Sequence, residues 1–205
     1  MTEKESTERF EGIISFILHF EVGLNRKYLS LPPEQAYQKA TQMPKAFAIV
    51  KGDRGGATMC GVTLSTYAAY RRKRGIATTT ATDLREMPYV QWRDILKGMF
   101  WDRWQADKIK DRWVAYALVD FAWHSGVHGI KIPQRIVGVK PDGIVGTKTL
   151  AAVNGFDPQE LFARIKMARL EFLNSIVRRD PSQGRFLKGW YNRVNAIEYG
   201  GFHYE

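Results

Sequence analysis

Apolar residues near the N-terminus recur at the spacing of an α-helical face. They follow one another at intervals of three and four residues: Phe10, Ile13, Ile14 and Ile17. This spacing predicts a helix with one buried side, capped at its start by Ser6 or Thr7. The next position on that side is Glu21, and Gly23 can end the helix because glycine adopts positive φ angles readily. The pattern therefore places a carboxylate on an inward-facing helix side, in the last turn.

Most of the remaining chain has the same helical character. We expect helices over residues 32–43, 66–74, 88–100, 111–125, 129–137, 147–153, 158–179 and 185–199. Ser65 is the expected cap of the second of these helices, and Asp157 is the expected cap of the longest. Residues 111–125 are apolar almost all round, which is typical of a buried central helix. Asp120 in this segment needs a partner; a structural hydrogen bond is the expected role, and a third catalytic carboxylate is the alternative. Only residues 58–63 have the pattern of a β-hairpin edge, so the predicted fold class is mainly α.

Composition limits the kind of site. The 205 residues suit one domain with a small additional lobe, and 44% of them are hydrophobic, which is enough for a large core. Cys60 is the only cysteine, so disulfides within the chain and cysteine-based metal clusters are excluded. The four histidines form no metal-ligand motif. We therefore expect neither a metal ion nor a cofactor.

The net charge of +10 favours an anionic partner, and both bacterial walls and nucleic acids are polyanionic. The basic run at residues 71–74 precedes Gly75 and is expected to be the solvated last turn of a helix, where cations complement the helix dipole. A basic nucleic-acid-binding protein is the alternative, although no recognition-helix motif supports it. The sequence contains no run of about 18 apolar residues, so no transmembrane helix is predicted. Residues 1–9 lack the pattern of a secretory signal.

A glycine-rich segment downstream of Glu21 contains a second carboxylate. Residues 52–58 read Gly-Asp-Arg-Gly-Gly-Ala-Thr and include Asp53, Gly56 and Thr58. Burial and the negative end of the helix dipole both favour a protonated Glu21, the state that a general acid requires. Many glycosidases pair such an acid with a second carboxylate, which Asp53 can provide. A frayed helix end at Glu21 and an ordinary surface turn at Asp53 are the alternatives.

Aromatic residues are concentrated between positions 92 and 113, and their faces can stack on sugar rings. Trp92 and Trp113 are expected to lie in the core, as large aromatic residues usually do. Two charged residues separate Trp101 from Trp104 and suggest that both are partly exposed. Trp101 is therefore a candidate for substrate contact.

Several segments resemble, in order, the motifs of glycoside hydrolase family 108. Residues 20–23 (Phe-Glu-Val-Gly) and 55–63 (Gly-Gly-Ala-Thr-Met-Cys-Gly-Val-Thr) resemble its Glu and Gly-Gly-Ala-Thr signatures. Residues 123–126 (Trp-His-Ser-Gly) are similar to its Asn-Ser-Gly motif. Residues 141–150 resemble its peptidoglycan-binding-like segment, and residues 186–193 resemble its C-terminal motif.

The family comprises lysozyme-like peptidoglycan hydrolases, so the resemblance implies a lysozyme-like helical fold with a small β-hairpin at the active-site cleft. It also implies N-acetylmuramidase activity. Glu21 would be the general acid, Asp53 would stabilise positive charge at the sugar or activate water, and Thr58 would position that water. The residues expected to contact substrate are Gly56, Thr63, Trp101, His124 and Ser125. The expected partner is the glycan strand of peptidoglycan.

The resemblance also suggests how the chain is organised. We expect residues 1–130 to form the catalytic domain, and residues 131–205 to form a C-terminal helical part packed on it. A monomer that acts in the periplasm or cell wall, after export or lysis, is the simplest expectation. The chain departs from the family at Val22, at His124 and in a long interval at residues 24–52, where an extra helix is expected to shape one wall of a cleft. Because of these departures, a catalytically inactive peptidoglycan-binding module is the alternative.

Overall fold

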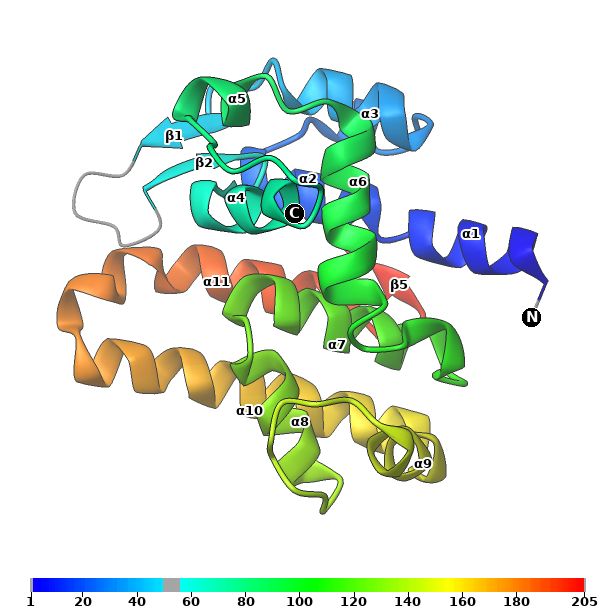
Figure 1. Cartoon of the computed structure of the whole chain (residues 1–205). Helices are drawn as coiled ribbons and strands as arrows, with labels where there is room; N and C mark the ends of the chain where they lie inside the picture. The colour runs from blue at the N-terminus through cyan, green and yellow to red at the C-terminus, as the bar shows by residue number, and fades with distance from the viewer. Residues whose placement is uncertain (1, 50–55, 205) are drawn as a thin grey trace. The chain divides into compact units, whose positions relative to one another are not determined.

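Helices dominate the computed structural model, which describes residues 2–49 and 56–204. The predicted mainly α class is confirmed. By packing, the chain divides into two units, Thr2–Met99 and Phe100–Glu205 (Figure 1). None of the helices in the described parts of the chain is both long and apolar enough to cross a membrane.

The first unit combines helices with one small sheet. Its helices are α1 (Glu3–Glu11), α2 (Ile14–Val22), the 3-10 turn η1 (Arg26–Tyr28), α3 (Pro33–Ala40), α4 (Leu64–Arg72), α5 (Ala81–Arg85) and α6 (Tyr89–Leu96). Its antiparallel strands are β1 (Phe47–Ile49), β2 (Ala57–Met59) and β3 (Val62–Thr63), in the order β1-β2-β3. The predicted hairpin at residues 58–63 is confirmed. Strand β1 was missed because three residues give too short an alternation to recognise.

The helix that carries Glu21 is shorter than the pattern predicted. Thr2 caps α1 through a capping box with Glu5, so the expected caps at Ser6 or Thr7 are wrong. A turn at residues 12–13 then separates α1 from α2, so the single continuous helix is also wrong. The predicted buried side is confirmed, since all four of its apolar residues are completely buried. The apolar spacing therefore described the packing of this segment correctly, although it did not detect the break.

The interval between Glu21 and the glycine-rich segment packs against the helix that carries Glu21. As predicted, it contains a helix, α3, whose first residue is Pro33. Helix α3 lies against α2. Its buried Tyr37 donates a hydrogen bond to the Met87 carbonyl at 2.7 Å, and its ring lies 5.4 Å from that of Trp92. The interval is therefore a structural support of α2.

The basic run at residues 71–74 ends α4, as predicted, and two of its members are engaged within the unit. Arg71 pairs with Asp83 at 2.8 Å. Arg74 pairs with Asp94 at 3.1 Å, and its guanidinium lies over the Tyr70 ring at 3.7 Å. These contacts give the run a role in packing α4, which weakens the case for a nucleic-acid surface there.

The second unit is built from long helices. The π-helical turn η2 (Lys97–Trp101) carries the chain across the division, and the remaining elements follow in order. They are η3 (Ala106–Lys108), α7 (Arg112–Ser125), α8 (His128–Ile136), α9 (Thr147–Gly155), α10 (Pro158–Arg179), η4 (Pro181–Gln183), α11 (Gly184–Ala196), β4 (Ile197–Glu198) and β5 (Gly201–Phe202). The short β4–β5 hairpin was not predicted.

Helix α7 is the buried centre of the second unit, as its sequence predicted. Helices α8 and α10 pack against α7, and α11 packs against α10 (Figure 1). One unit thus contains residues from both sides of the predicted boundary at 130. The division into a catalytic domain and a C-terminal part at that residue stays a prediction about function.

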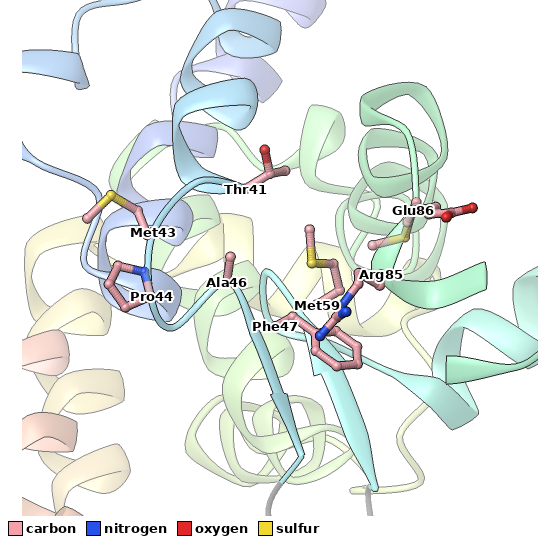
Figure 2. Close-up of a pocket in the computed structure, with 9 residues that line it drawn as sticks. Thr41, Met43, Pro44, Ala46, Phe47, Met59, Arg85 and Glu86 are labelled. Atoms are coloured by element: carbon pink, nitrogen blue, oxygen red, sulfur yellow. The ribbon is translucent and has the colours of Figure 1, made fainter. Parts of the chain in front are cut away.

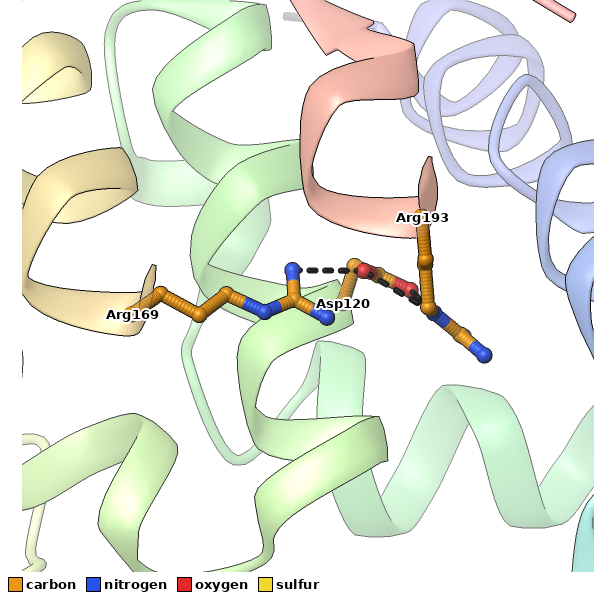
Figure 3. Close-up of polar contacts among 3 residues, drawn as sticks. All are labelled: Asp120, Arg169 and Arg193. Carbon is orange, nitrogen blue, oxygen red and sulfur yellow. Dashed lines mark hydrogen bonds and ion pairs between the residues drawn. The ribbon is translucent and has the colours of Figure 1, made fainter. Parts of the chain in front are cut away.

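A buried ion cluster joins the three long helices of this unit. Asp120 of α7 lies between Arg169 of α10 and Arg193 of α11 (Figure 3). Arg169 Nη1 donates to Asp120 Oδ2 at 2.7 Å, and Arg193 Nη2 donates to Asp120 Oδ1 at 2.7 Å. All three side chains are buried. The expected structural role of Asp120 is confirmed.

The two arginines determine the ionisation of Asp120. Burial alone would raise the pKa of this carboxyl, but the two guanidinium groups, Arg193 and then Arg169, outweigh burial and hold the pKa well below its usual range. Asp120 is therefore a carboxylate at neutral pH. The ionised Asp120 stabilises the folded state fully at pH values above about 3.9, the ordinary aspartate pKa. This stabilisation declines as the pH falls below that value.

Asp120→Asn should destabilise the protein by about 3–5 kcal/mol at pH 7, because it leaves two buried guanidinium groups without their counter-charge. Glu160→Gln is the matched control, since it removes an exposed ion pair with Arg164 on the same helix α10 and should cost under about 1 kcal/mol. Urea unfolding of the three proteins measures both effects. The gap between wild type and Asp120→Asn should narrow as the pH falls below about 4; equal losses for the two variants would contradict the account.

Candidate active site

The last turn of α2 fixes the position of Glu21. Gly23 ends the helix with φ 72° and ψ 40°, and its N–H donates to the His19 carbonyl at 2.9 Å. The His19 ring contacts the Leu24 carbonyl, with 2.7 Å between Nδ1 and the oxygen. Glu21 is half-buried in this turn. The predicted helix end at Gly23 is confirmed.

A tight turn between β2 and β3 faces this helix end. Met59 pairs with Val62, so only Cys60 and Gly61 lie between the strands. Their φ angles are 46° and 82°, and positive φ at both central residues is the signature of a type I′ hairpin turn. The Cys60 N–H donates to the Ala46 carbonyl at 2.8 Å, and Trp92 Nε1 donates to the Cys60 carbonyl at 2.9 Å. A positive φ is unfavourable for a residue with a side chain such as Cys60, so these two bonds stabilise the turn against that cost.

The Glu21 side chain lies directly on this turn. A Cβ atom at Gly61 would be 2.6 Å from Cγ and Cδ of Glu21 and 2.7 Å from Oε2. Gly61 is thus required twice, by its positive φ and by the space that the glutamate occupies. Burial first, and the nearby Glu21 carboxylate second, raise the pKa of the Cys60 thiol to about 12. Cys60 is therefore a packed thiol and not a nucleophile.

The two predicted threonines of the site are cross-strand partners. Thr58 of β2 pairs directly with Thr63 of β3, so both lie on the same face of the sheet. Thr63 already has a structural function, because its Oγ1 accepts the Thr66 N–H at 3.2 Å and caps α4. The cap expected at Ser65 is wrong. Thr58 is half-buried, in a strand whose flanking residues Ala57 and Met59 are buried.

The second predicted carboxylate, Asp53, lies outside the described residues, within the segment that joins β1 to β2. Gly56 is the first described residue after it. Gly56 has φ 66°, and a Cβ atom there would meet nothing within 4 Å. Its predicted role in contact with substrate stays a prediction.

A groove of about 500 Å³ lies beside the sheet in the same unit (Figure 2). The interval that precedes β2 supplies most of its wall, including Met43, Pro44 and Phe47. Arg85 of α5 closes the other side, with its guanidinium 4.5 Å from the centre of the Phe47 ring. The interval's lining residues follow α3 in the chain, and α3 itself does not line the groove, so the expected role of the extra helix in shaping a cleft stays a prediction.

Three of the predicted substrate contacts, Trp101, His124 and Ser125, belong to the second unit. Trp101 is 0% exposed, as is Trp104, so the expected partial exposure of both is wrong. The charged residues between the two tryptophans are exposed while the indoles point inward. A completely buried ring offers no face to a sugar, so Trp101 packs the core.

His124 and Ser125 form the end of α7, where Gly126 adopts φ 57°. Both are half-buried. The His124 ring meets Trp190 edge-on, with 6.0 Å between the ring centres. Burial, followed by the charges of Arg193 and Arg169, lowers the pKa of His124 to about 3. His124 is therefore neutral at pH 7, and a role for either residue in binding stays a prediction.

Sequence reasoning missed the most constrained residue of the site, Gly61. The signal was present, because a residue pair ending in glycine between two short β runs is typical of a two-residue hairpin. The contact with Glu21, in contrast, joins positions 40 residues apart, which no local pattern indicates. Within residues 2–49 and 56–204, no group of three or more His, Cys, Asp or Glu side chains could hold a metal ion.

Gly61→Ala should destabilise the protein by about 2–5 kcal/mol, the sum of about 1–2 for a side chain at positive φ and about 1–3 for displacing Glu21. Gly75→Ala is the matched control, since Gly75 has the same φ of 82° and nothing within 4 Å of an added Cβ. Gly75→Ala should lower the unfolding free energy only by the about 1–2 kcal/mol that a side chain at positive φ costs. Denaturant unfolding compares the two variants, and equal losses would mean that Glu21 does not occupy the turn.

Comparisons with known proteins agree with this arrangement. Residues 47–126 match the model of a family described as glycosyl hydrolase 108, and residues 128–195 match one described as a predicted peptidoglycan domain. The first match includes Thr58, Gly61 and Thr63 and begins after Glu21. A search of curated proteins found no match.

A solved structure described as Brucella abortus SagA resembles this chain in sequence and in fold. The two share 31% sequence identity and a TM-score of 0.64, over 74% of this chain and 83% of that one. This extent of similarity, together with the two matched models, confirms the lysozyme-like fold and a lysozyme-like function directed at peptidoglycan. The chain belongs to glycoside hydrolase family 108.

Proposed function

We propose that the protein is an N-acetylmuramidase that cuts the bond between muramic acid and glucosamine in peptidoglycan, with Glu21 as the general acid. The observation that carries the proposal is the Glu21 carboxyl, held at the end of α2 against the Cys60–Gly61 turn. A general acid must stay fixed relative to the leaving oxygen, and the helix end and the hairpin restrict this side chain from two sides. The matched family model and the peptidoglycan domain support the substrate class.

In this mechanism Glu21 donates its proton to the glycosidic oxygen as the bond to that oxygen breaks. Positive charge then develops on the sugar ring, and a second carboxylate either stabilises that charge or activates a water molecule. Asp53 is the proposed second carboxylate, because it lies in the glycine-rich segment that leads into β2. Its replacement by Asn should therefore reduce turnover while leaving the fold unchanged.

Thr58 is the proposed water-positioning residue. It is half-buried on the same small sheet whose turn contacts Glu21, whereas the hydroxyl of its partner Thr63 is engaged in capping α4. We propose action at the periplasmic or wall face of the envelope, where peptidoglycan is found.

Glu21→Gln should lower the release of reducing ends from purified peptidoglycan by on the order of 10²–10⁴, the typical contribution of a general acid. Glutamine keeps the size of the side chain, so the circular dichroism spectrum and the unfolding midpoint should change little. Glu34→Gln is the control: it removes an exposed carboxylate of the same unit and should retain full activity.

Full activity in Glu21→Gln would refute its assignment as the acid. A wild-type protein that binds peptidoglycan without releasing any reducing ends would instead support the alternative of an inactive binding module.

Thr58→Val and Thr63→Val should separate chemistry from stability. Thr63→Val removes the cap of α4 and should cost about 1 kcal/mol in unfolding free energy. Thr58→Val keeps the β-branched shape and should leave stability nearly unchanged, yet lower turnover by about tenfold through loss of one hydrogen bond to water. Urea unfolding and reducing-end assays on both variants test this division. The reverse pattern would reassign the water-positioning role to Thr63.

A further inference from the structure

A basic pocket lies between α8 and α10 in the second unit. Its volume is about 420 Å³. Helix α8 contributes His128, Ile132 and Arg135, and α10 contributes Phe172, Arg178 and Arg179. The residues that line it include no carboxylate.

The arginines of α10 are held in place by contacts along the same helix. Arg178 Nη2 donates to Glu171 Oε1 at 2.6 Å, and Glu171 lies outside the pocket lining. Arg179 Nε donates to the Ser175 carbonyl at 3.1 Å. Arg135 approaches from the other helix; it is exposed, and the part of the chain that the structure describes provides it with no ion pair. Three guanidinium groups thus line one concave space, and one of them, that of Arg178, is paired with a carboxylate outside the lining.

Helix dipoles explain only part of this arrangement. Arg178 and Arg179 lie in the last turn of α10, and Arg135 lies in the last turn of α8, where cations are favourable. That effect does not require cations of two helices to line the same pocket. Residues 128–195 contain twelve Lys and Arg but only five Asp and Glu, so this segment accounts for +7 of the net charge of +10. Like charges gathered in this way repel one another unless an anion lies between them.

The pocket also has an apolar side. The His128 and Phe172 rings lie 4.9 Å apart and are tilted by 30°, and Ile132 lines the same space. Guanidinium groups recognise carboxylate and phosphate oxygens in paired hydrogen bonds. A pocket that combines them with an aromatic and an aliphatic side chain suits an oxyanion carried on a carbon chain.

We infer that this basic pocket binds an oxyanion of a cell-wall polymer and anchors the protein on the insoluble wall independently of Glu21. The oxyanion is either a carboxylate of the wall peptides or a phosphodiester of a wall-linked polymer. The wall as the source of the anion rests on the proposed function, whereas the pocket itself rests on the lining residues. A site of this kind would raise the local concentration of the enzyme on its substrate.

The test compares two double variants with equal loss of charge. Arg135→Gln with Arg179→Gln removes two cations from the pocket. Arg103→Gln with Lys110→Gln removes two exposed cations of the same unit that lie outside the pocket and outside residues 128–195. Sedimentation with insoluble peptidoglycan at physiological salt should show about tenfold weaker binding for the pocket variant and less than a twofold change for the control. Equal weakening of both variants, or no weakening of either, would overturn the inference.

Chemically treated walls identify the anion. If amidation of the wall carboxyl groups abolishes the difference between wild type and the pocket variant, the ligand is a carboxylate. If removal of phosphodiester polymers with hydrofluoric acid abolishes it, the ligand is a phosphate. A difference that survives both treatments would overturn the assignment to a wall oxyanion.

Activity separates this inference from the proposed function. At saturating substrate, the pocket variant should release reducing ends at the wild-type rate, because the site affects binding and not chemistry. Wild-type protein that releases no reducing ends, but whose wall binding depends on Arg135 and Arg179, would refute the muramidase and leave the anchoring site intact. Matching circular dichroism spectra and unfolding midpoints confirm that each variant is folded.

Discussion

The close contact between Glu21 and Gly61 is the constraint on which the candidate site depends. It exists because the chain makes a hairpin turn with two positive φ angles and leaves the second position without a side chain. The turn is held by a hydrogen bond from the Cys60 N–H to the Ala46 carbonyl and by one from the Trp92 indole to the Cys60 carbonyl. The helix end is fixed by Gly23 and by α3, which packs along α2. A carboxyl held from two sides in this way has little freedom to relax away from a substrate.

The second unit depends on a different interaction, a buried ion cluster. Its helices are tied together by Asp120, Arg169 and Arg193, in which one buried carboxylate bonds to two buried guanidinium groups (Figure 3). Such a cluster contributes little net stability compared with apolar packing, yet breaking it is costly, so it enforces one arrangement of α7, α10 and α11. Arg193, which lies in the motif at residues 186–193, is one of the three residues of the cluster. The cluster also sets the electrostatic surroundings of His124, which the two arginines help to keep neutral.

Local patterns predicted the helices well and the long-range contacts poorly. The buried side of residues 10–17, the cap at Asp157 and the buried helix at residues 111–125 all follow from periodicity and capping, which are local properties. The break at residues 12–13 was missed because its apolar spacing continues on both sides of the turn. Trp101 was misjudged because exposed charged neighbours say nothing about the direction of the indole. The proximity of Glu21 to Gly61 depends on tertiary packing, so the sequence suggested the residues of the site but not their contact.

Identification of the products tests the central claim most directly. Purified peptidoglycan would be digested with the wild-type protein, the new ends reduced with borohydride, and the fragments analysed by mass spectrometry. The account predicts fragments that carry reduced muramic acid, as expected for cleavage of the bond from muramic acid to glucosamine. Fragments that carry reduced glucosamine, or a digest without new reducing ends, would contradict it.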